Sequence, residues 1–202
     1  KEDLFVAEAA SLAAIREAGA ITAPRPLCIG SDGAHSWLVM EFLDLESQSS
    51  RGEARLGQRL AELHRHCANT FGFHRGNYIG KTRQPNERTS DWCHFFREQR
   101  LAVQLDIARR NGAPGRLIDC GKRLQSEVHA FFTDYRPEPS LLHGDLWNGN
   151  TGYIATGEPV IFDPAAYFGD READLAMTEL FGGLSERFYQ SYRQSWSLDP
   201  GY

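Results

Sequence analysis

The stretch HGDLWNGN (residues 143–150), followed by IFDP (residues 161–164), holds the densest group of chemically active side chains in the sequence. Asp145 and Asn150 lie five residues apart in a predicted loop, and Asp163 ends an apolar strand thirteen residues after Asn150. A β-hairpin between Asn150 and Asp163 would bring these two side chains together. One carboxylate and one amide could then share a divalent cation, which leaves the second carboxylate to face another group.

This arrangement matches the needs of phosphoryl transfer. A carboxylate must accept the proton of the attacking hydroxyl, and oxygen ligands must hold Mg²⁺ on the nucleotide phosphates. Asp145 is therefore the candidate catalytic base, and Asn150 and Asp163 are the candidate metal ligands. Taken alone, His143 would more often be a structural histidine, the octapeptide a turn and Asp163 a strand end. Their joint spacing favours a phosphotransfer site.

Most of the chain carries the apolar spacing of amphipathic helices. Such spacing predicts four helices, at residues 4–19, 56–67, 91–103 and 117–131. A further helical part is expected from Asp174 onward. Gly19 is the expected end of the first helix, and Asp91 is the expected N-cap of the third. The fourth helix is expected to turn four apolar side chains inward: Leu117, Leu124, Val128 and Phe131.

Strand signals are fewer and begin early in the chain. Residues 37–40 (WLVM) predict a short buried strand, and residues 153–162 predict a β-hairpin that turns at Thr156-Gly157. The polar residues 46–52 predict a loop. Residues 69–90 lack periodicity, and their aromatic side chains favour an ordered loop.

Composition excludes several classes of protein. The chain has 202 residues and a net charge of −5, with no basic run, so nucleic acid is not an expected partner. No apolar run reaches membrane-spanning length and the first residues are no signal peptide, so no membrane partner is expected. Four cysteines without a CxxC pair argue against a zinc site and favour reduced thiols in a cytoplasmic protein: Cys28, Cys67, Cys93 and Cys120.

The decisive stretch resembles the protein-kinase catalytic loop, H-x-D-x-x-x-x-N, with its later metal-binding Asp. Gly144 in the second position resembles the small-molecule branch, which includes aminoglycoside and choline kinases. Together with IFDPAAYFGDREADLAM (residues 161–177), the octapeptide is similar to the fructosamine/ketosamine-3-kinase family. Four upstream segments extend the similarity over nearly the whole chain: FVAEAASL (5–12), LVMEFL (38–43), FGF…NYIG…QPN (71–86) and WCHFFREQRL (92–101).

This resemblance implies an α+β, two-lobe, protein-kinase-like fold. Residues 1–45 would be the remainder of a small β-containing N-lobe, and residues 46–202 a larger, mostly helical C-lobe with the catalytic loop. Glu8 lies on an apolar helix face, where an unpaired charge is costly. The resemblance implies that it is the αC-type Glu that pairs with a phosphate-binding lysine, and an exposed Glu is the alternative. Backbone groups of the hinge would bind adenine: Met40, Glu41, Phe42 and Leu43.

Other roles also follow from the resemblance. Asp174 would buttress the catalytic loop, with an N-cap as the alternative, and His143 would support the same loop. Trp147 is a candidate for stacking on a sugar ring or for the core. The loop at residues 71–86 and Arg100 are weaker substrate-side candidates. The phosphate-binding lysine and the Gly-rich strands of such kinases are not visible in the sequence. We therefore expect a portion of a longer protein.

The resemblance implies an ATP- and Mg²⁺-dependent kinase for deglycation. Its acceptor would be the 3-hydroxyl of a fructosamine or ribulosamine, on a free amine or on a glycated protein lysine. One alternative is another small-molecule kinase, acting on an aminoglycoside or an amino alcohol such as choline; such sites usually carry clustered acids. A second alternative is a nucleotide-binding pseudokinase. A third is a metal-dependent hydrolase, which would normally need more His or carboxylate ligands. The physiological amine and the oligomeric state stay open.

Overall fold

The computed structural model describes residues 2–46, 50–200 and 202. It begins with helix α1 (Glu2–Ala18), which buries Leu12 and Ile15 and ends at Gly19. The φ angle of Gly19 is 66°, a left-handed conformation that glycine adopts without strain and that commonly ends a helix. The predicted first helix and its end are therefore confirmed.

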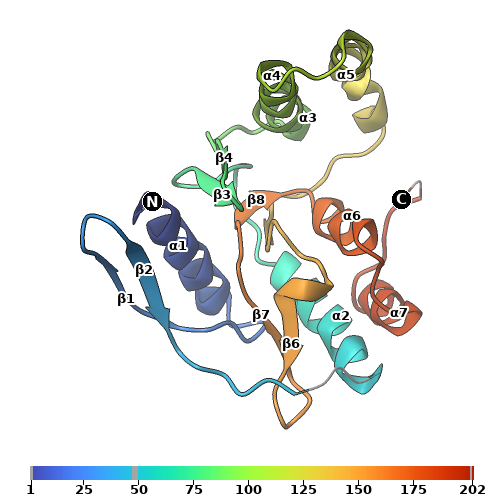
Figure 1. Ribbon diagram of the computed structural model, residues 1–202. Coiled ribbons are helices and arrows are strands. Elements are labelled where there is room, and N and C mark those ends of the chain that lie inside the picture. Colours follow the sequence, from blue (N-terminus) through green and yellow to red (C-terminus); the bar gives the residue numbers. More distant parts are fainter. Residues whose placement is uncertain (1, 47–49, 201) are drawn as a thin grey trace.

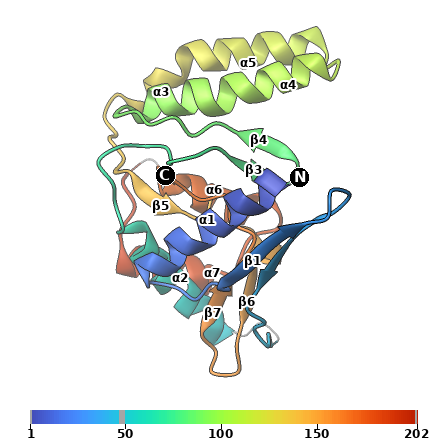
Figure 2. The ribbon, with the colours of Figure 1, turned by 90° about the vertical axis from the view of Figure 1, so that its left-hand side faces the viewer.

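Two antiparallel strands lie beside α1 (Figure 2): β1 (Pro26–Ser31) and β2 (Ser36–Met40). The predicted strand is confirmed, but the prediction that it is buried is wrong, because Trp37 and Val39 are 41% and 42% exposed. Side chains alternate across a strand. Leu38 and Met40 pack on the core, and Trp37 and Val39 therefore lie on the opposite face of the pair.

Three helices contribute side chains to the main core: α2 (Ser50–His64), α6 (Glu172–Leu180) and α7 (Glu186–Ser195). Helices α2 and α7 lie side by side (Figure 1). A Cβ atom on Gly57 of α2 would lie 2.3 Å from the carbonyl oxygen of Phe188, so a glycine is needed for this close approach. Leu56, Leu60 and Leu63 are fully buried in the main core.

The limits of α2 differ from the prediction. The helix ends at His64, and Cys67 is exposed beyond it. Part of the predicted loop 46–52 lies outside the described residues, but Ser50 already begins α2. Polar residues are common in the first turn of a helix, where acidic side chains such as Glu53 complement the helix dipole. Polarity at this point therefore marked a helix start and not a loop.

A helical hairpin forms one end of the molecule (Figure 2). Asp91 caps its first helix by accepting a hydrogen bond from the His94 N–H at 2.9 Å, as predicted. The elements of this part are α3 (Trp92–Phe96), the π-helix η1 (Arg97–Leu101), α4 (Ala102–Arg110), α5 (Gly115–Glu127) and the 3-10 helix η2 (Val128–Phe132).

The inward orientation predicted for the fourth helix is mostly wrong. Val128 is buried, but Leu117, Leu124 and Phe131 are 54%, 45% and 69% exposed. The reason is that α5 and η2, which carries Phe131, stand at the edge of the molecule, where α5 packs on α4 and η1 (Figure 1). These neighbours cover only part of the apolar face.

Three further strand pairs are short and antiparallel: β3 (Asn77–Ile79) with β4 (Thr82–Gln84), β5 (Ser140–Leu142) with β8 (Tyr167–Gly169), and β6 (Thr151–Tyr153) with β7 (Pro159–Ile161). The predicted hairpin is the β6–β7 pair, in which Thr151 faces Ile161. The ordered loop predicted at residues 69–90 buries Phe71 and Phe73 and contains the β3–β4 pair. Within the described ranges, no helix is long and apolar enough to cross a bilayer.

Candidate active site

A cavity of about 350 Å³ opens beside the end of the β6–β7 pair. It brings together five of the residues that the sequence singled out, from α1 and from the predicted catalytic region: Glu8, Asp145, Trp147, Asn150 and Asp163. The rest of its wall comes from the start of α1, the β3–β4 hairpin and the residue after Asp163: Leu4, Asn77, Tyr78, Gly80 and Pro164.

The backbone around the start of the predicted catalytic loop is held by Asp174, which is 1% exposed on α6. Its Oδ2 atom accepts from the His143 N–H at 2.7 Å, and its Oδ1 atom accepts from the Gly144 N–H at 2.8 Å. Burial alone would raise the pKa of Asp174, but a hydrogen bond from His64 and the backbone N–H donors outweigh burial and lower it. Asp174 therefore stays a carboxylate, and both oxygens accept.

His143 links the loop to the strand that leads to Asp163. Its Nε2 atom lies 3.0 Å from the Phe162 carbonyl oxygen, and its Nδ1 atom accepts from the Asp145 N–H at 3.3 Å. The first contact requires a proton on Nε2, and the second requires a lone pair on Nδ1. Burial lowers the pKa of His143, which agrees with this neutral form.

The β6–β7 hairpin brings Asn150 and Asp163 together. The Phe162 N–H donates to the Asn150 carbonyl oxygen at 3.1 Å, directly before Asp163. The side-chain nitrogen of Asn150 donates to the Asp145 carbonyl oxygen at 2.9 Å, which turns the amide oxygen away from that carbonyl. Asp163 is the one non-glycine residue in the described ranges with a positive φ, 55°. Such backbone conformations are uncommon and gather at functional sites.

The cavity is acidic. Three carboxyl groups line it, those of Glu8, Asp145 and Asp163. Its described wall contains no Lys or Arg. Burial, and after it the charge and hydrogen bond of Asp163, raise the pKa of Glu8 to about 7. Burial and the charges of Asp174 and Asp163 raise the pKa of Asp145. A site that concentrates negative charge in this way suits a cationic guest.

The donor set fits Mg²⁺. Asn150 and Asp163 offer one amide oxygen and one carboxylate, and Mg²⁺ is usually bound by one or two carboxylates together with waters and substrate phosphates. Across the described residues, no three His, Cys, Asp or Glu side chains group closely enough to hold a metal ion alone. The site thus resembles a partial ligand set that a nucleotide would complete.

Two sets of predicted site residues lie elsewhere. Arg100 donates to the Pro85 carbonyl oxygen at 2.8 Å and to the Asn86 side chain at 2.7 Å, and its guanidinium covers Tyr167. It is absent from the described wall of the cavity, so its role toward substrate stays a prediction. These contacts give Arg100 a structural role, because they link α3 and η1 to the loop that precedes them.

The predicted hinge also lies outside the cavity wall: Met40, Glu41, Phe42 and Leu43. The Glu41 N–H donates to the Arg25 carbonyl oxygen at 2.8 Å, and its carboxylate accepts from the Arg25 N–H at 3.1 Å. Phe42 is 87% exposed. This segment begins at the last residue of β2, and its adenine contacts stay a prediction.

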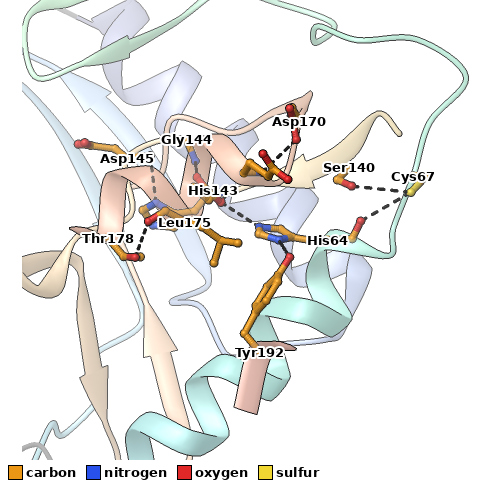
Figure 3. Close-up of polar contacts among 12 residues, drawn as sticks. His64, Cys67, Ser140, His143, Gly144, Asp145, Asp170, Leu175, Thr178 and Tyr192 are labelled. Carbon is orange, nitrogen blue, oxygen red and sulfur yellow. Dashed lines mark hydrogen bonds and ion pairs between the residues drawn. The ribbon is translucent and has the colours of Figure 1, made fainter. Parts of the chain in front are cut away.

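Sequence reasoning missed His64 and Tyr192, and it included Asn77 only within the loop at residues 71–86, a weaker substrate-side candidate. His64 and Tyr192 are fully buried and extend the polar contacts of Asp174 (Figure 3). Asn77 is 1% exposed and donates to the Ala166 carbonyl oxygen at 2.9 Å. A signal existed for His64, because it falls at helical spacing from Leu60, on an apolar face of a predicted helix.

Comparisons with known structures define the class. A protein from Haemophilus somnus assigned as a fructosamine-3-kinase superposes with a TM-score of 0.90 at 30% identity, covering 98% of this chain and 66% of that chain. An amicoumacin kinase shares the fold with a TM-score of 0.58 at 15% identity, covering 98% of this chain and 64% of that one. The chain therefore has a protein-kinase-like α+β fold.

The family model described as fructosamine kinase matches residues 1–202. A protein of Synechocystis named a probable ketoamine kinase is 46% identical over 200 residues, covering 98% of this chain and 67% of the relative. A chloroplastic protein-ribulosamine 3-kinase of Arabidopsis thaliana is 39% identical, covering 98% of this chain and 61% of the relative. The chain belongs to the fructosamine kinase family, and it spans about two thirds of the length of these relatives.

Proposed function

We propose that the protein is an ATP-dependent kinase that phosphorylates a sugar hydroxyl of a ketoamine of the fructosamine or ribulosamine type. Membership of the fructosamine kinase family supports this proposal, as do the names of its relatives. The observation that carries it is the convergence of Asp145, Asn150 and Asp163 on one acidic cavity. Loss of the phosphorylated sugar from the amine would make the protein part of a deglycation system.

Asp145 acts as the catalytic base. Its carboxylate faces the cavity from a loop whose backbone is fixed by Asp174. The acceptor hydroxyl gives its proton to Asp145 while its oxygen forms a bond to the γ-phosphorus, and the bond from that phosphorus to the β,γ-bridging oxygen breaks to leave ADP. The raised pKa of Asp145 makes this carboxylate a better proton acceptor.

Asn150 and Asp163 would hold Mg²⁺. The ion would supply positive charge that offsets the negative charge developing on the phosphates during transfer. The two side chains are held on the same hairpin, so their relative position is set before the ligand arrives. Glu8 lies next to Asp163 and would pair with a phosphate-binding lysine. The backbone of residues 40–43 would contact adenine.

Trp147 is the proposed platform for the sugar. It lines the cavity, is 38% exposed, and meets Phe181 edge to face at a ring-centroid distance of 5.8 Å. An exposed indole beside a polar cavity suits the apolar face of a sugar ring. The acceptor would be carried on a free amine or on a protein lysine. A cytoplasmic location and the lobe boundary at residues 45/46 stay predictions.

Kinetic assays with four acceptors (a fructosamine, a ribulosamine, choline and kanamycin) test this function in the full-length protein. We expect Mg²⁺-dependent ATP consumption with a fructosamine and a ribulosamine at a kcat/KM well above the values for choline and kanamycin. A higher kcat/KM with choline or kanamycin would contradict the proposal that the acceptor is a ketoamine. Absence of transfer to all four acceptors, with ATP still bound, would favour a nucleotide-binding pseudokinase.

A further inference from the structure

The indole of Trp147 is supported from two sides. A Cβ atom on Gly149 would lie 2.2–2.5 Å from three atoms of the Trp147 ring, so the indole lies directly against the Gly149 backbone. The second support is Phe181, whose ring plane makes an angle of 60° with that of the indole. Among the described residues, no other aromatic ring packs on Trp147. Part of the indole still faces the cavity and stays open to a ligand.

The backbone that carries Phe181 is itself fixed. Phe181 directly follows α6, and residues 182–183 are glycines with φ angles of 100° and 74°, which turn the chain sharply after it. The Tyr189 hydroxyl, on α7, lies 3.0 Å from Thr178 Oγ1 and accepts from the Leu184 N–H at 3.4 Å. These contacts tie the turn back to α6, so the position of Phe181 does not depend on burial of its ring.

The stability of the fold gives little reason for a phenyl ring here. Phe181 is 61% exposed and belongs to neither hydrophobic core cluster. Its ring meets the indole edge to face, an arrangement in which aromatic rings attract each other beyond the area that they bury. Without this ring, the indole would keep its contact with Gly149 and would be freer to turn about its side-chain bonds, because exposed side chains change rotamer rapidly.

We propose that Phe181 is a positioning residue for the acceptor, which acts through Trp147 by holding the indole in the orientation that receives the sugar. This inference rests on the proposed function for its kinetic part. A platform held in place before binding lowers the entropy that the complex must lose. Helix α6 and the residue after it would then support the loop at two points, with Asp174 at residues 143–144 and Phe181 at Trp147.

The effect should fall on acceptor binding, because Phe181 does not line the described cavity and touches neither Asp145 nor the proposed metal ligands. Three variants of the full-length protein test this. Phe181→Leu removes the ring and keeps an apolar side chain. Phe181→Tyr keeps the ring and should restore the wild-type behaviour. Phe131→Leu is the control, because Phe131 is 69% exposed on η2 and lies outside the wall of this cavity.

Steady-state kinetics with a ketoamine acceptor separate positioning from lost stability. In Phe181→Leu we expect the KM for the acceptor to rise by about threefold to tenfold, with kcat and the KM for ATP within about twofold of wild type. A loss of folded protein would lower the apparent kcat instead. Phe181→Tyr and Phe131→Leu should keep the acceptor KM within about twofold of wild type. An unchanged acceptor KM in Phe181→Leu, or equal rises in the Leu and Tyr variants, would overturn the proposal.

A double-mutant cycle tests whether Phe181 acts through Trp147. In a Trp147→Ala background, adding Phe181→Leu should change the acceptor KM by less than about twofold, because the indole that Phe181 holds is already gone. If Phe181→Leu raises the acceptor KM by the same factor with and without Trp147, the two side chains act independently and the positioning role is wrong.

Nuclear magnetic resonance gives a readout that does not depend on activity. The indole N–H signal of Trp147 is assigned by its loss in Trp147→Phe, and its heteronuclear NOE reports fast motion of the ring. This NOE should be lower in Phe181→Leu than in wild type and in Phe181→Tyr. Equal values in the three proteins would overturn the positioning role. If wild-type protein phosphorylates no ketoamine, the proposed function fails, and the NOE still decides whether Phe181 holds the indole.

Discussion

Gly144 offers a test of how the catalytic loop is built. Its φ is 83°, and a Cβ atom there would lie 2.1 Å from the Ala165 carbonyl oxygen and 2.8 Å from its carbonyl carbon. In Gly144→Ala the left-handed backbone costs about 1–2 kcal/mol. The clash involves backbone and cannot be relieved by a rotamer change. Moving Ala165 would break its N–H bond to the His143 carbonyl oxygen, now 2.9 Å, at a further cost of about 1 kcal/mol.

The expected loss is therefore about 2–3 kcal/mol, or a fall in Tm of about 4–12 °C at roughly 2–4 °C per kcal/mol. Gly112→Ala is the matched control, because Gly112 has a φ of 76° and a Cβ atom added to it would meet no described atom within 4 Å. It should lose only the backbone part, about 1–2 kcal/mol. Differential scanning calorimetry of both full-length variants measures the difference. Equal Tm values for the two would refute the close approach of Gly144 to Ala165.

Two further predictions concern the proposed metal ligands and His143. In calorimetry, Asp163→Ala should weaken Mg²⁺-dependent ATP binding by about tenfold or more. The control Asp119→Ala, which changes an exposed residue of α5, should leave this affinity unchanged. Equal affinity in wild type and Asp163→Ala would count against Asp163 as a metal ligand. Because burial lowers the pKa of His143, the unfolded state binds more protons than the folded state below about pH 6.5. The free energy of unfolding should therefore fall as the pH drops through that value, and it should fall less steeply in His143→Asn. Urea titrations at several pH values measure it, and an equal pH dependence in the two proteins would contradict this prediction.

Local sequence was sufficient for the parts of the site that lie close together in the chain. Asp145, Asn150 and Asp163 are joined by one loop and one hairpin, so their spacing predicted that they meet. Gly19 and Asp91 were likewise predicted as helix ends, because caps depend on neighbouring residues alone.

Long-range packing could not be predicted in the same way. The exposure of Leu117 depends on α5 having a helix on one side only, and periodicity cannot tell a covered apolar face from an open one. The partners of His64 lie 110 and 128 residues away, on α6 and α7. Its position on an apolar face was a signal that went unused, and the identity of the partners required the tertiary structure.

The role of Asp145 is the central claim, and Asp145→Asn tests it most directly. The substitution keeps the shape of the side chain and removes the proton acceptor. In full-length protein with a ketoamine acceptor, we predict that kcat falls by about a hundredfold or more, while the Kd of Mg²⁺-ATP stays nearly unchanged. Turnover at the wild-type rate in Asp145→Asn would contradict the account.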